Sequence, residues 1–422
     1  MLDRTQAPKF HLPEDFTLSD PVKWLTPSGV PVFYFRTPLL EAVKIEIVSK
    51  GARKHLPLSK NLVPSFTLQL LTEGTHSQTE NQLSEFFDFY ASEVQPSSGF
   101  SREGISLLTT KKHLTTVLPV FLSLLTEANF PEEKLKKKKS LRKLGLKLER
   151  EKTSSRASQL FRMALFGPNH PYGLEINEAH IDEVSRQDLL DYRDQILWNE
   201  AEIFISGDFS LSELNELNGR LEQVPYVRFV EPAWTEEIQQ RFALSEERPQ
   251  AFQTSIRIGA WSIPKNHPDY FPLSVFNTVL GGYFGSRLIK NIREDKGHTY
   301  GISSSLGEID DFPYWSIAAD VQKQFKKEVL EEIRKEIHLL SSQLIAPDEL
   351  ELVRNYLIGQ MVGRFSTSFD WVDRYKSVHF SGLDFSFYRK KMEFLRSFDA
   401  EEILEKGSKY FTEAPVIEIT VG

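Results

Sequence analysis

The sequence contains no cysteine among its 422 residues. Disulfides, thiolate metal ligands and a cysteine nucleophile are therefore excluded, and any metal site would have to use histidine and carboxylate side chains. The sequence also lacks an uninterrupted apolar stretch of about 18 residues, the length that a transmembrane helix needs. We therefore expect no membrane-spanning helix. The absence of cysteine leaves open whether the protein works in a reducing or an oxidising compartment.

A net positive charge is also missing, because 51 basic residues stand against 59 acidic ones and give a formal charge of −8. Nucleic acids and anionic membranes attract proteins through a positive field, so we expect neither as a partner. The one strongly basic stretch is the lysine run 136–139. We interpret this run as a solvated helix face.

The first eight residues contain neither the apolar segment of a secretory signal nor the amphipathic, arginine-rich pattern of a transit peptide. This favours a cytoplasmic protein, and a periplasmic location stays open.

An internal duplication is present. A strand-like segment leads into a Gly-Ala pair at 51–52 in the first half and at 259–260 in the second. Each pair precedes an apolar, helix-forming stretch that ends at glycine, namely Gly74 and the pair 281–282. We expect positive φ at these glycines, as at many helix C-termini. A duplicated unit predicts two halves of similar architecture.

The later parts of the two halves match as well. Apolar residues at helical spacing predict amphipathic helices over 114–125 and 325–340, and Ser185 and Asp399 suit the N-caps of the closing helix-then-strand units. Strand patterns and helix patterns occur in clusters instead of strict alternation. This predicts an α+β fold of two homologous domains, each a mainly antiparallel sheet covered by helices.

A chain of this length fits two domains. We place the N-terminal domain at 1–224 and the C-terminal domain at 251–422. Residues 225–250 hold scattered proline, charged and aromatic residues without a steady period. We interpret this stretch as a linker with one edge strand.

Six short motifs follow one another in a distinctive order: LLTEGT at 70–75, NHPYG at 169–173, ISGD at 205–208, HPDY at 267–270, LGGYFGSRL at 280–288 and IREDKGHTY at 292–300. Together they resemble the pitrilysin/insulinase family of zinc metallopeptidases, the inverted zincins. The resemblance covers nearly the whole chain and is strongest to the small members with two domains per chain, such as processing-peptidase subunits. It implies that the two domains form one half of a clam shell.

Active members of that family carry H-x-x-E-H on a helix, in which the histidines hold zinc and the glutamate is the general base. In this sequence Ser65 and Gln69 stand at the histidine positions and Leu68 at the glutamate position. None of these side chains can take over the corresponding role. The family's third ligand, a later glutamate, corresponds to the neighbourhood of the lysine run 136–139.

None of the ten histidines has a second histidine four residues away with glutamate between them. An autonomous zinc peptidase therefore lacks its ligands. We expect no catalytic residue acting alone, no bound metal and no cofactor, with zinc only in a partner subunit.

The resemblance also implies a substrate-binding pair in the second domain. In the family, an arginine and a tyrosine seven residues apart reach substrate near the zinc, and the matching positions here are Arg293 and Tyr300. Such side chains suit the stabilisation of negative charge on a peptide carbonyl. The alternative is that Arg293 pairs with Glu294 and Asp295 at the surface, and that Tyr300 simply begins a strand.

Two other motifs have structural interpretations. The glycine-rich stretch 280–287 lacks the Lys-Ser/Thr ending of a phosphate-binding loop and is interpreted as a turn between two helices. His170 is interpreted as a hydrogen-bonding turn residue with no metal role.

The main functional hypothesis is a non-catalytic subunit that binds peptides together with a homologous subunit bearing H-x-x-E-H. A homodimer would use the same faces. The alternative is a structural or peptide-binding scaffold without a peptidase role, similar to the core subunits of respiratory complexes that the resemblance includes.

Overall fold

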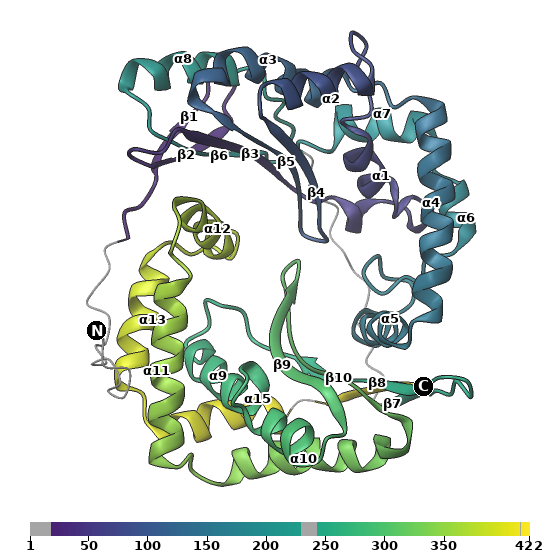
Figure 1. Ribbon diagram of the computed structural model, residues 1–422, viewed down its shortest axis with the longest axis vertical. Coiled ribbons are helices and arrows are strands. Elements are labelled where there is room, and N and C mark those ends of the chain that lie inside the picture. Colours follow the sequence, from purple (N-terminus) through teal and green to yellow (C-terminus); the bar gives the residue numbers. More distant parts are fainter. Residues whose placement is uncertain (1–17, 229–242, 414) are drawn as a thin grey trace, which may run out of the picture.

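The protein was analysed as a computed structural model that describes residues 18–228, 243–413 and 415–422. Its strands form two separate sheets, one in each half of the chain, and helices cover the outer side of each sheet (Figure 1). The α+β fold of two similar halves is therefore confirmed.

The first sheet contains β1 (Val22–Leu25), β2 (Pro31–Arg36), β3 (Ala42–Lys50), β4 (Glu93–Ser98), β5 (Arg102–Thr110) and β6 (Glu202–Gly207). The second contains β7 (Ala243–Glu246), β8 (Gln253–Trp261), β9 (Thr299–Ile309), β10 (Phe312–Gln322) and β11 (Ile417–Val421).

The helices of the first half are α1 (Val63–Leu70), α2 (Glu80–Phe89), α3 (Lys111–Glu127), α4 (Glu132–Glu151), α5 (Thr153–Phe166), α6 (Glu178–Asp182), α7 (Arg186–Gln195) and α8 (Leu211–Leu221). Those of the second half are α9 (Tyr270–Asn277), α10 (Lys326–Ser342), α11 (Pro347–Gly363), α12 (Ser368–His379), α13 (Ser386–Ser397), α14 (Ala400–Glu402) and α15 (Ser408–Thr412). Short π-helical segments lie at Thr278–Gly282, Ile289–Asp295 and Ile403–Gly407.

The duplication extends to the strand order. The first sheet runs β1-β2-β6-β3-β5-β4 and the second β7-β11-β8-β10-β9, so that the two orders match strand for strand once β1 is set aside. The pair β2 and β6 is parallel, as is its counterpart β7 and β11, and all other neighbours are antiparallel. Strand β7 lies within the stretch 225–250 and forms one edge of the second sheet.

Local sequence accounts for most of these elements. Strand β3 reads AVKIEIVSK and buries Val43, Ile45 and Ile47 from one face, as β-branched residues at alternate positions should. Helix α3 buries the apolar face predicted for 114–125. Ser185 and Asp399 cap α7 and α14 through side-chain hydrogen bonds, which confirms both predicted N-caps.

Each half lends one helix to the other half's sheet. Helix α5 of the first half packs on the second sheet, where its residues share a buried cluster with strand β11: Ala157, Leu160, Phe161, Ala164, Ile417, Ile419 and Val421. Helix α12 of the second half packs on the first sheet, and the Tyr375 ring lies 5.7 Å from Phe33 and 5.3 Å from Phe35. Each sheet is therefore covered in part by a helix from the other half.

A glycine makes one of these contacts possible. A Cβ atom added to Gly259 of β8 would lie 2.2 Å from the carbonyl oxygen of Trp315 and 2.7 Å from the Phe161 ring. Any side chain at this position would push β10 or α5 away from β8.

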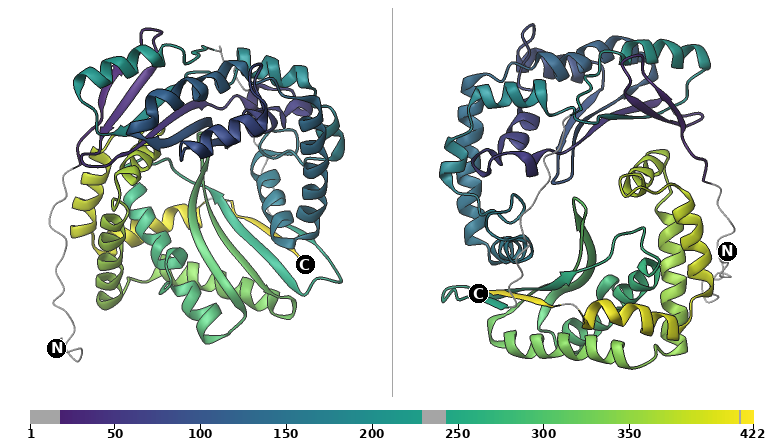
Figure 2. Two further views of the ribbon diagram at one scale, coloured as in Figure 1. Left: turned by 45° about the horizontal axis from the view of Figure 1, so that its top comes forward. Right: turned by 180° about the vertical axis from the view of Figure 1, so that it is seen from behind.

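Polar contacts also join the halves. The Lys376 amine of α12 lies 2.5 Å from the Glu46 carboxylate of β3. At the tip of the hairpin between β9 and β10, the Asp310 carboxylate accepts hydrogen bonds from Lys54 at 2.8 Å and Tyr172 at 3.0 Å. Figures 1 and 2 show the outcome: α4 and α5 connect the sheets on one side, and α11 to α13 connect them on the other.

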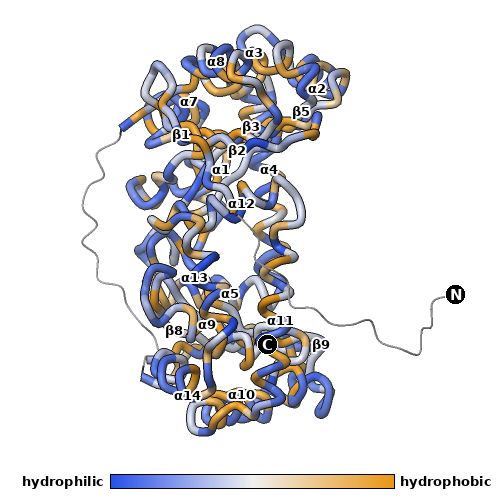
Figure 3. Tube along the Cα trace, turned by 90° about the vertical axis from the view of Figure 1, so that its left-hand side faces the viewer, coloured by the Kyte–Doolittle hydropathy of each residue, from blue (hydrophilic) through white to orange (hydrophobic). Residues whose placement is uncertain are grey.

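Hydrophobic and hydrophilic stretches alternate along most helices, as expected where one face is buried and the other is solvated (Figure 3). Within the described residues, no helix is both long enough and apolar enough to cross a bilayer.

Candidate functional site

The degenerate zinc motif lies on α1, and its three positions point in two directions. Ser65 and Gln69, four residues apart, both line one cavity of about 660 Å³. Leu68 has only 1% of its surface exposed and belongs to the main core of the first half. The position that would carry the general base is thus part of the hydrophobic core instead of the cavity wall.

Helix α4 forms another wall of the same cavity through Arg142, Leu146 and Glu149. The Arg142 guanidinium and the Glu149 carboxylate form an ion pair at 2.8 Å. Leucine and arginine are unsuitable zinc ligands, and the one carboxylate of this wall, Glu149, is engaged by Arg142.

This placement corrects the expected neighbourhood of the third ligand. No residue of the lysine run 136–139 is among those that line the cavity in the described chain. Lys138 instead lies 3.6 Å from the Glu73 carboxylate, and Lys139 donates to the Asp182 carbonyl. Because α4 rises about 1.5 Å per residue, the run ends roughly 10 Å along the axis before Leu146. The part of α4 that lines the cavity is 142–150.

The donors present do not fit a zinc ion. The Ser65 hydroxyl donates to the carbonyl of Leu62 at 3.2 Å, and Gln69 offers only a neutral amide. Throughout the described residues, no group of three or more histidine, aspartate or glutamate side chains is arranged to hold a metal ion.

Of the arginine and tyrosine predicted to touch substrate, Tyr300 is exposed and Arg293 is half-buried. Arg293 lies in the π-helical segment Ile289–Asp295, with its guanidinium carbon 4.9 Å from the centroid of the Phe284 ring. Tyr300 is the second residue of β9 and is 91% exposed, while Phe284 is 64% exposed. Strand β9 is itself the outer strand of the second sheet.

The backbone holds the segments that carry this pair side by side. The His298 amide donates to the carbonyl of Ile292 at 3.0 Å, which ties the start of β9 to the π-helical segment. In the described part of the chain, Arg293 forms no ion pair with either Glu294 or Asp295. The surface ion-pair cluster is therefore not the arrangement found.

The glycine pair at 281–282 differs from the expectation. Gly74 has a φ of +139°, as expected after α1, but neither glycine of the pair has a positive φ. A Cβ atom on Gly281 would instead lie 2.6 Å from the Ser304 amide nitrogen of β9. Gly281 is thus explained by close approach to a strand, a tertiary requirement.

His170 is a buried turn residue, as predicted. Its Nδ1 accepts from the Tyr172 amide at 3.1 Å, and its ring stacks on Phe166. Burial lowers the pKa of His170 to about 4, so that the imidazole is neutral at physiological pH.

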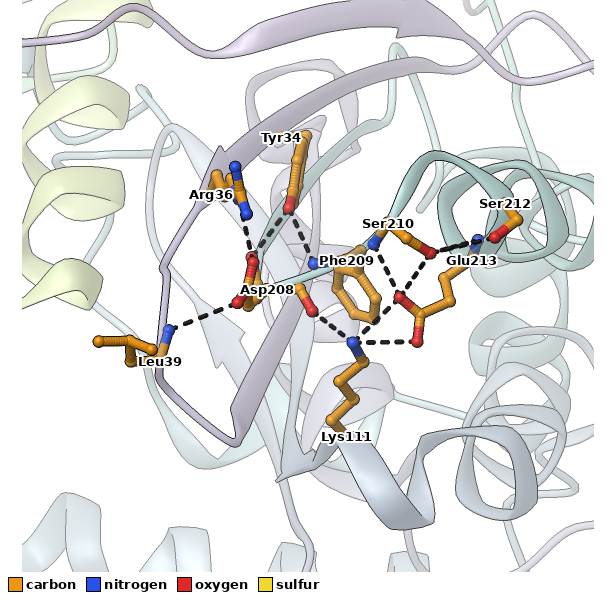
Figure 4. A network of polar contacts seen from close by, with 10 residues as sticks. Tyr34, Arg36, Leu39, Lys111, Asp208, Phe209, Ser210, Ser212 and Glu213 are labelled. Atoms are coloured by element: carbon orange, nitrogen blue, oxygen red, sulfur yellow. Dashed lines mark hydrogen bonds and ion pairs between the residues drawn. The ribbon is translucent and has the colours of Figure 1, made fainter.

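Asp208, the last residue of the motif 205–208, belongs to a network of polar contacts (Figure 4). Asp208 accepts from the Arg36 side chain at 3.0 Å, which lowers the pKa of the Asp208 carboxyl, and the Lys111 amine donates to the Asp208 carbonyl at 2.6 Å. Lys111 also pairs with Glu213 at 2.9 Å. The network joins the ends of β2 and β6 to α3 and α8, so it maintains the fold of the first half.

The cavity beside Ser65 and Gln69 contains the functional candidates that sequence reasoning missed. Its walls carry six arginines: Arg53, Arg142, Arg150, Arg156, Arg162 and Arg257. They come from the segment after β3, from α4, from α5 and from β8. No motif links these positions in the sequence, because the cavity exists only once α5 has packed on the other half.

The two-domain fold and the degenerate motif together resemble a zinc peptidase in which other residues stand at the metal-ligand positions. Comparison with known proteins agrees. A family profile described as "Peptidase M16 inactive domain" matches residues 183–357. That match begins near the end of the first half and does not reach 65–69.

Two relatives resemble most of the chain. The "Uncharacterized zinc protease YmxG" of Bacillus subtilis is 23% identical, with 79% of this chain and 82% of the relative aligned. The "Non-peptidase homolog YmxG" of Helicobacter pylori is 22% identical, with 89% and 87% aligned. The two names disagree about zinc, and the residues Ser65, Leu68 and Gln69 agree with the second.

Solved structures share the fold. A peptidase M16 inactive domain from Pseudomonas fluorescens superimposes with a TM-score of 0.84 over 96% of this chain and 98% of its own, at 19% identity. A chain of complex III2 from Candida albicans gives a TM-score of 0.75 at 15% identity, with 95% of each chain covered. The predicted resemblance is confirmed: the chain is similar to M16 peptidases over most of its length, and residues 183–357 match the inactive domain of that family.

Proposed function

We propose that this chain is the zinc-less subunit of an M16-type peptidase complex, in which it binds peptide and supplies Arg293 and Tyr300 to the active site of a zinc-bearing homologue. The observation that carries the proposal is that a backbone hydrogen bond holds the segments of the exposed Tyr300 and the half-buried Arg293 side by side. A guanidinium and a phenol presented in this way can donate to a peptide carbonyl as negative charge develops.

The outer position of β9 supports peptide binding beside this pair. An edge strand offers unpaired backbone groups, to which an extended peptide can add as a further strand. Tyr300 is at the start of this strand, so a peptide paired with β9 would pass it.

The partner we propose is a homologous subunit that carries H-x-x-E-H and the zinc ion. A second copy of this chain could occupy the same faces, since both halves share one architecture. We keep the cytoplasm as the proposed compartment, with the periplasm as the alternative.

The test is peptide cleavage by a complex reconstituted with an H-x-x-E-H-bearing homologue from the same source. We expect Arg293→Ala to reduce kcat by about 10²-fold while the complex still assembles, because one donor to the transition state is lost. Arg334→Ala is the matched control, since Arg334 is an exposed arginine on α10 that pairs with Glu418. Equal loss of activity in both variants, or none in either, would contradict the proposed role.

A structural scaffold is the second candidate, and the likeness in fold to a chain of complex III2 supports it. In this case the chain would assemble with partners without any effect of Arg293 on cleavage. The same variant therefore separates the two candidates.

A further inference from the structure

The cavity beside the degenerate zinc motif has an unusual charge for this protein. Its walls carry six arginines and two carboxylates, Glu149 and Glu175, which is a formal balance of +4. The whole chain has a net charge of −8. Positive charge is thus concentrated at the place where a peptidase of this fold would hold its cation.

Three of the arginines are already paired with carboxylates. Arg142 pairs with Glu149 at 2.8 Å, and Arg150 lies 3.7 Å from Glu175. Arg156 binds Glu175 at 2.9 Å and also Glu246, from β7, at 2.7 Å. These pairs shape the walls and leave little positive charge to attract a ligand.

The other three, Arg53, Arg162 and Arg257, form no ion pair within 4 Å among the described residues, although a carboxylate further away acts on each: Glu103, Glu149 and Asp320. Arg162 donates to the Gln159 amide oxygen, and Arg257 donates to the Ser158 hydroxyl at 3.3 Å and to a backbone carbonyl. Burial lowers the pKa of both Arg162 and Arg257, which means that their charges lie in a poorly hydrated environment.

Arg53 and Arg162 also lie against the same aromatic ring. Their guanidinium carbons are 5.1 Å and 5.8 Å from the centroid of Phe100, and the Nε atom of each is buried without a hydrogen-bond partner in the described structure. Two like charges with unused donors beside one ring repel each other. An anion between them would relieve the repulsion and accept those hydrogen bonds.

The cavity also borders a place where a peptide can lie. Ser98, the last residue of β4, is one of its lining residues, and β4 is the outer strand of the first sheet. An extended peptide that adds to β4 would pass the mouth of the cavity with alternate side chains directed to one face.

We infer that this cavity binds the carboxylate side chains of acidic peptide segments, with Arg53, Arg162 and Arg257 as the recognising groups. The forked guanidinium matches a carboxylate in geometry, so arginine selects it over the neutral amide. This inference rests on the proposed peptide-binding function and names its substrate class. An anion-binding wall would then stand where a zinc peptidase of this fold binds its cation.

The test is fluorescence anisotropy of the full chain, without any partner subunit, with three labelled peptides of equal length. One is rich in aspartate and glutamate, one has asparagine and glutamine at those positions, and one is rich in lysine. We expect the acidic peptide to bind at least about tenfold more tightly than its amide counterpart, a ratio typical of one charged contact. Equal binding of the two would overturn the inference.

Variants then locate the binding. Arg53→Gln and Arg257→Gln should each weaken binding of the acidic peptide about tenfold, whereas the control Arg334→Gln should leave it unchanged. Arg162→Lys, which keeps the charge, serves where Arg162→Gln fails to fold, and the Tm of every variant is measured. Unchanged affinity in folded Arg53 and Arg257 variants would refute the assignment.

Binding of inorganic pyrophosphate, compared with binding of the acidic peptide, separates a peptide site from a site for small anions. If inorganic pyrophosphate binds and depends on Arg53 while the acidic peptide does not bind, the cavity takes free anions and the peptide inference is wrong. The outcome is independent of catalysis, because a subunit could fail to support cleavage and still bind acidic peptides, or the reverse.

Discussion

Glu103, on β5, should make the stability of this protein fall as pH rises. The side chain is 1% exposed, and one carboxylate oxygen accepts from the Tyr192 hydroxyl at 2.6 Å. The other oxygen is buried without a hydrogen-bond partner in the described residues. Burial raises the pKa of Glu103 from 4.5 to about 7, although the Tyr192 hydrogen bond and the charge of Arg53 act in the opposite direction.

The sign follows from which state releases its proton first. Between pH 4.5 and about 7 the unfolded chain loses the Glu103 proton while the folded chain keeps it, so deprotonation favours the unfolded state. At 1.36 kcal/mol per pKa unit, the full effect is about 3 kcal/mol. Stability that is present at pH 4.5 is thus lost as pH rises through 7.

The assay is urea unfolding of the wild type and of Glu103→Gln at pH 5 and pH 8. Glutamine has no charge to desolvate and can still accept from Tyr192, so the variant should gain about 2 to 3 kcal/mol relative to the wild type between the two pH values. His170 acts in the opposite sense, since its lowered pKa makes stability rise with pH between about 4 and 6.5. That contribution is common to both proteins and cancels in the difference. Parallel pH profiles for the two proteins would refute the reasoning.

Two further predictions concern the contacts between the halves. Gly259→Ala should destabilise the protein by about 1 to 3 kcal/mol, seen as a lower Tm in thermal unfolding, because the added Cβ has no space; an unchanged Tm would show that the strands adjust freely. Lys376→Met should cost about 2 kcal/mol in urea unfolding, since it leaves the Glu46 carboxylate, 11% exposed, with only the Lys44 amine at 3.1 Å. The double variant with Glu46→Gln should recover most of that loss, and an equal loss in single and double variants would contradict the role of the pair.

Local patterns in the sequence predicted the elements that local forces determine. The apolar spacing over 114–125 predicted α3, and Ser185 predicted the start of α7, because helix periodicity and capping depend on neighbouring residues. The duplication predicted the matching sheets. It did not predict the exchange of α5 and α12 between the halves, since no local pattern states which sheet a helix covers.

The candidate site was predictable in part for the same reason. The motif order located Ser65, Leu68 and Gln69, but counting along the chain put the third position at 136–139, whereas α4 lines the cavity through 142–150. Spacing between two helices depends on loop length, which the motifs do not fix. The arginines of the cavity come from distant segments and acquire their common environment only through packing.

We propose that this chain lacks its own zinc site and acts only with a zinc-bearing homologue. The most direct measurement is the zinc content of the purified chain, together with peptide cleavage by the chain alone and mixed with that homologue. We predict substoichiometric zinc and no cleavage for the lone chain, with cleavage above that of the homologue alone in the mixture. One tightly bound zinc ion per chain, with cleavage by the chain alone, would contradict it.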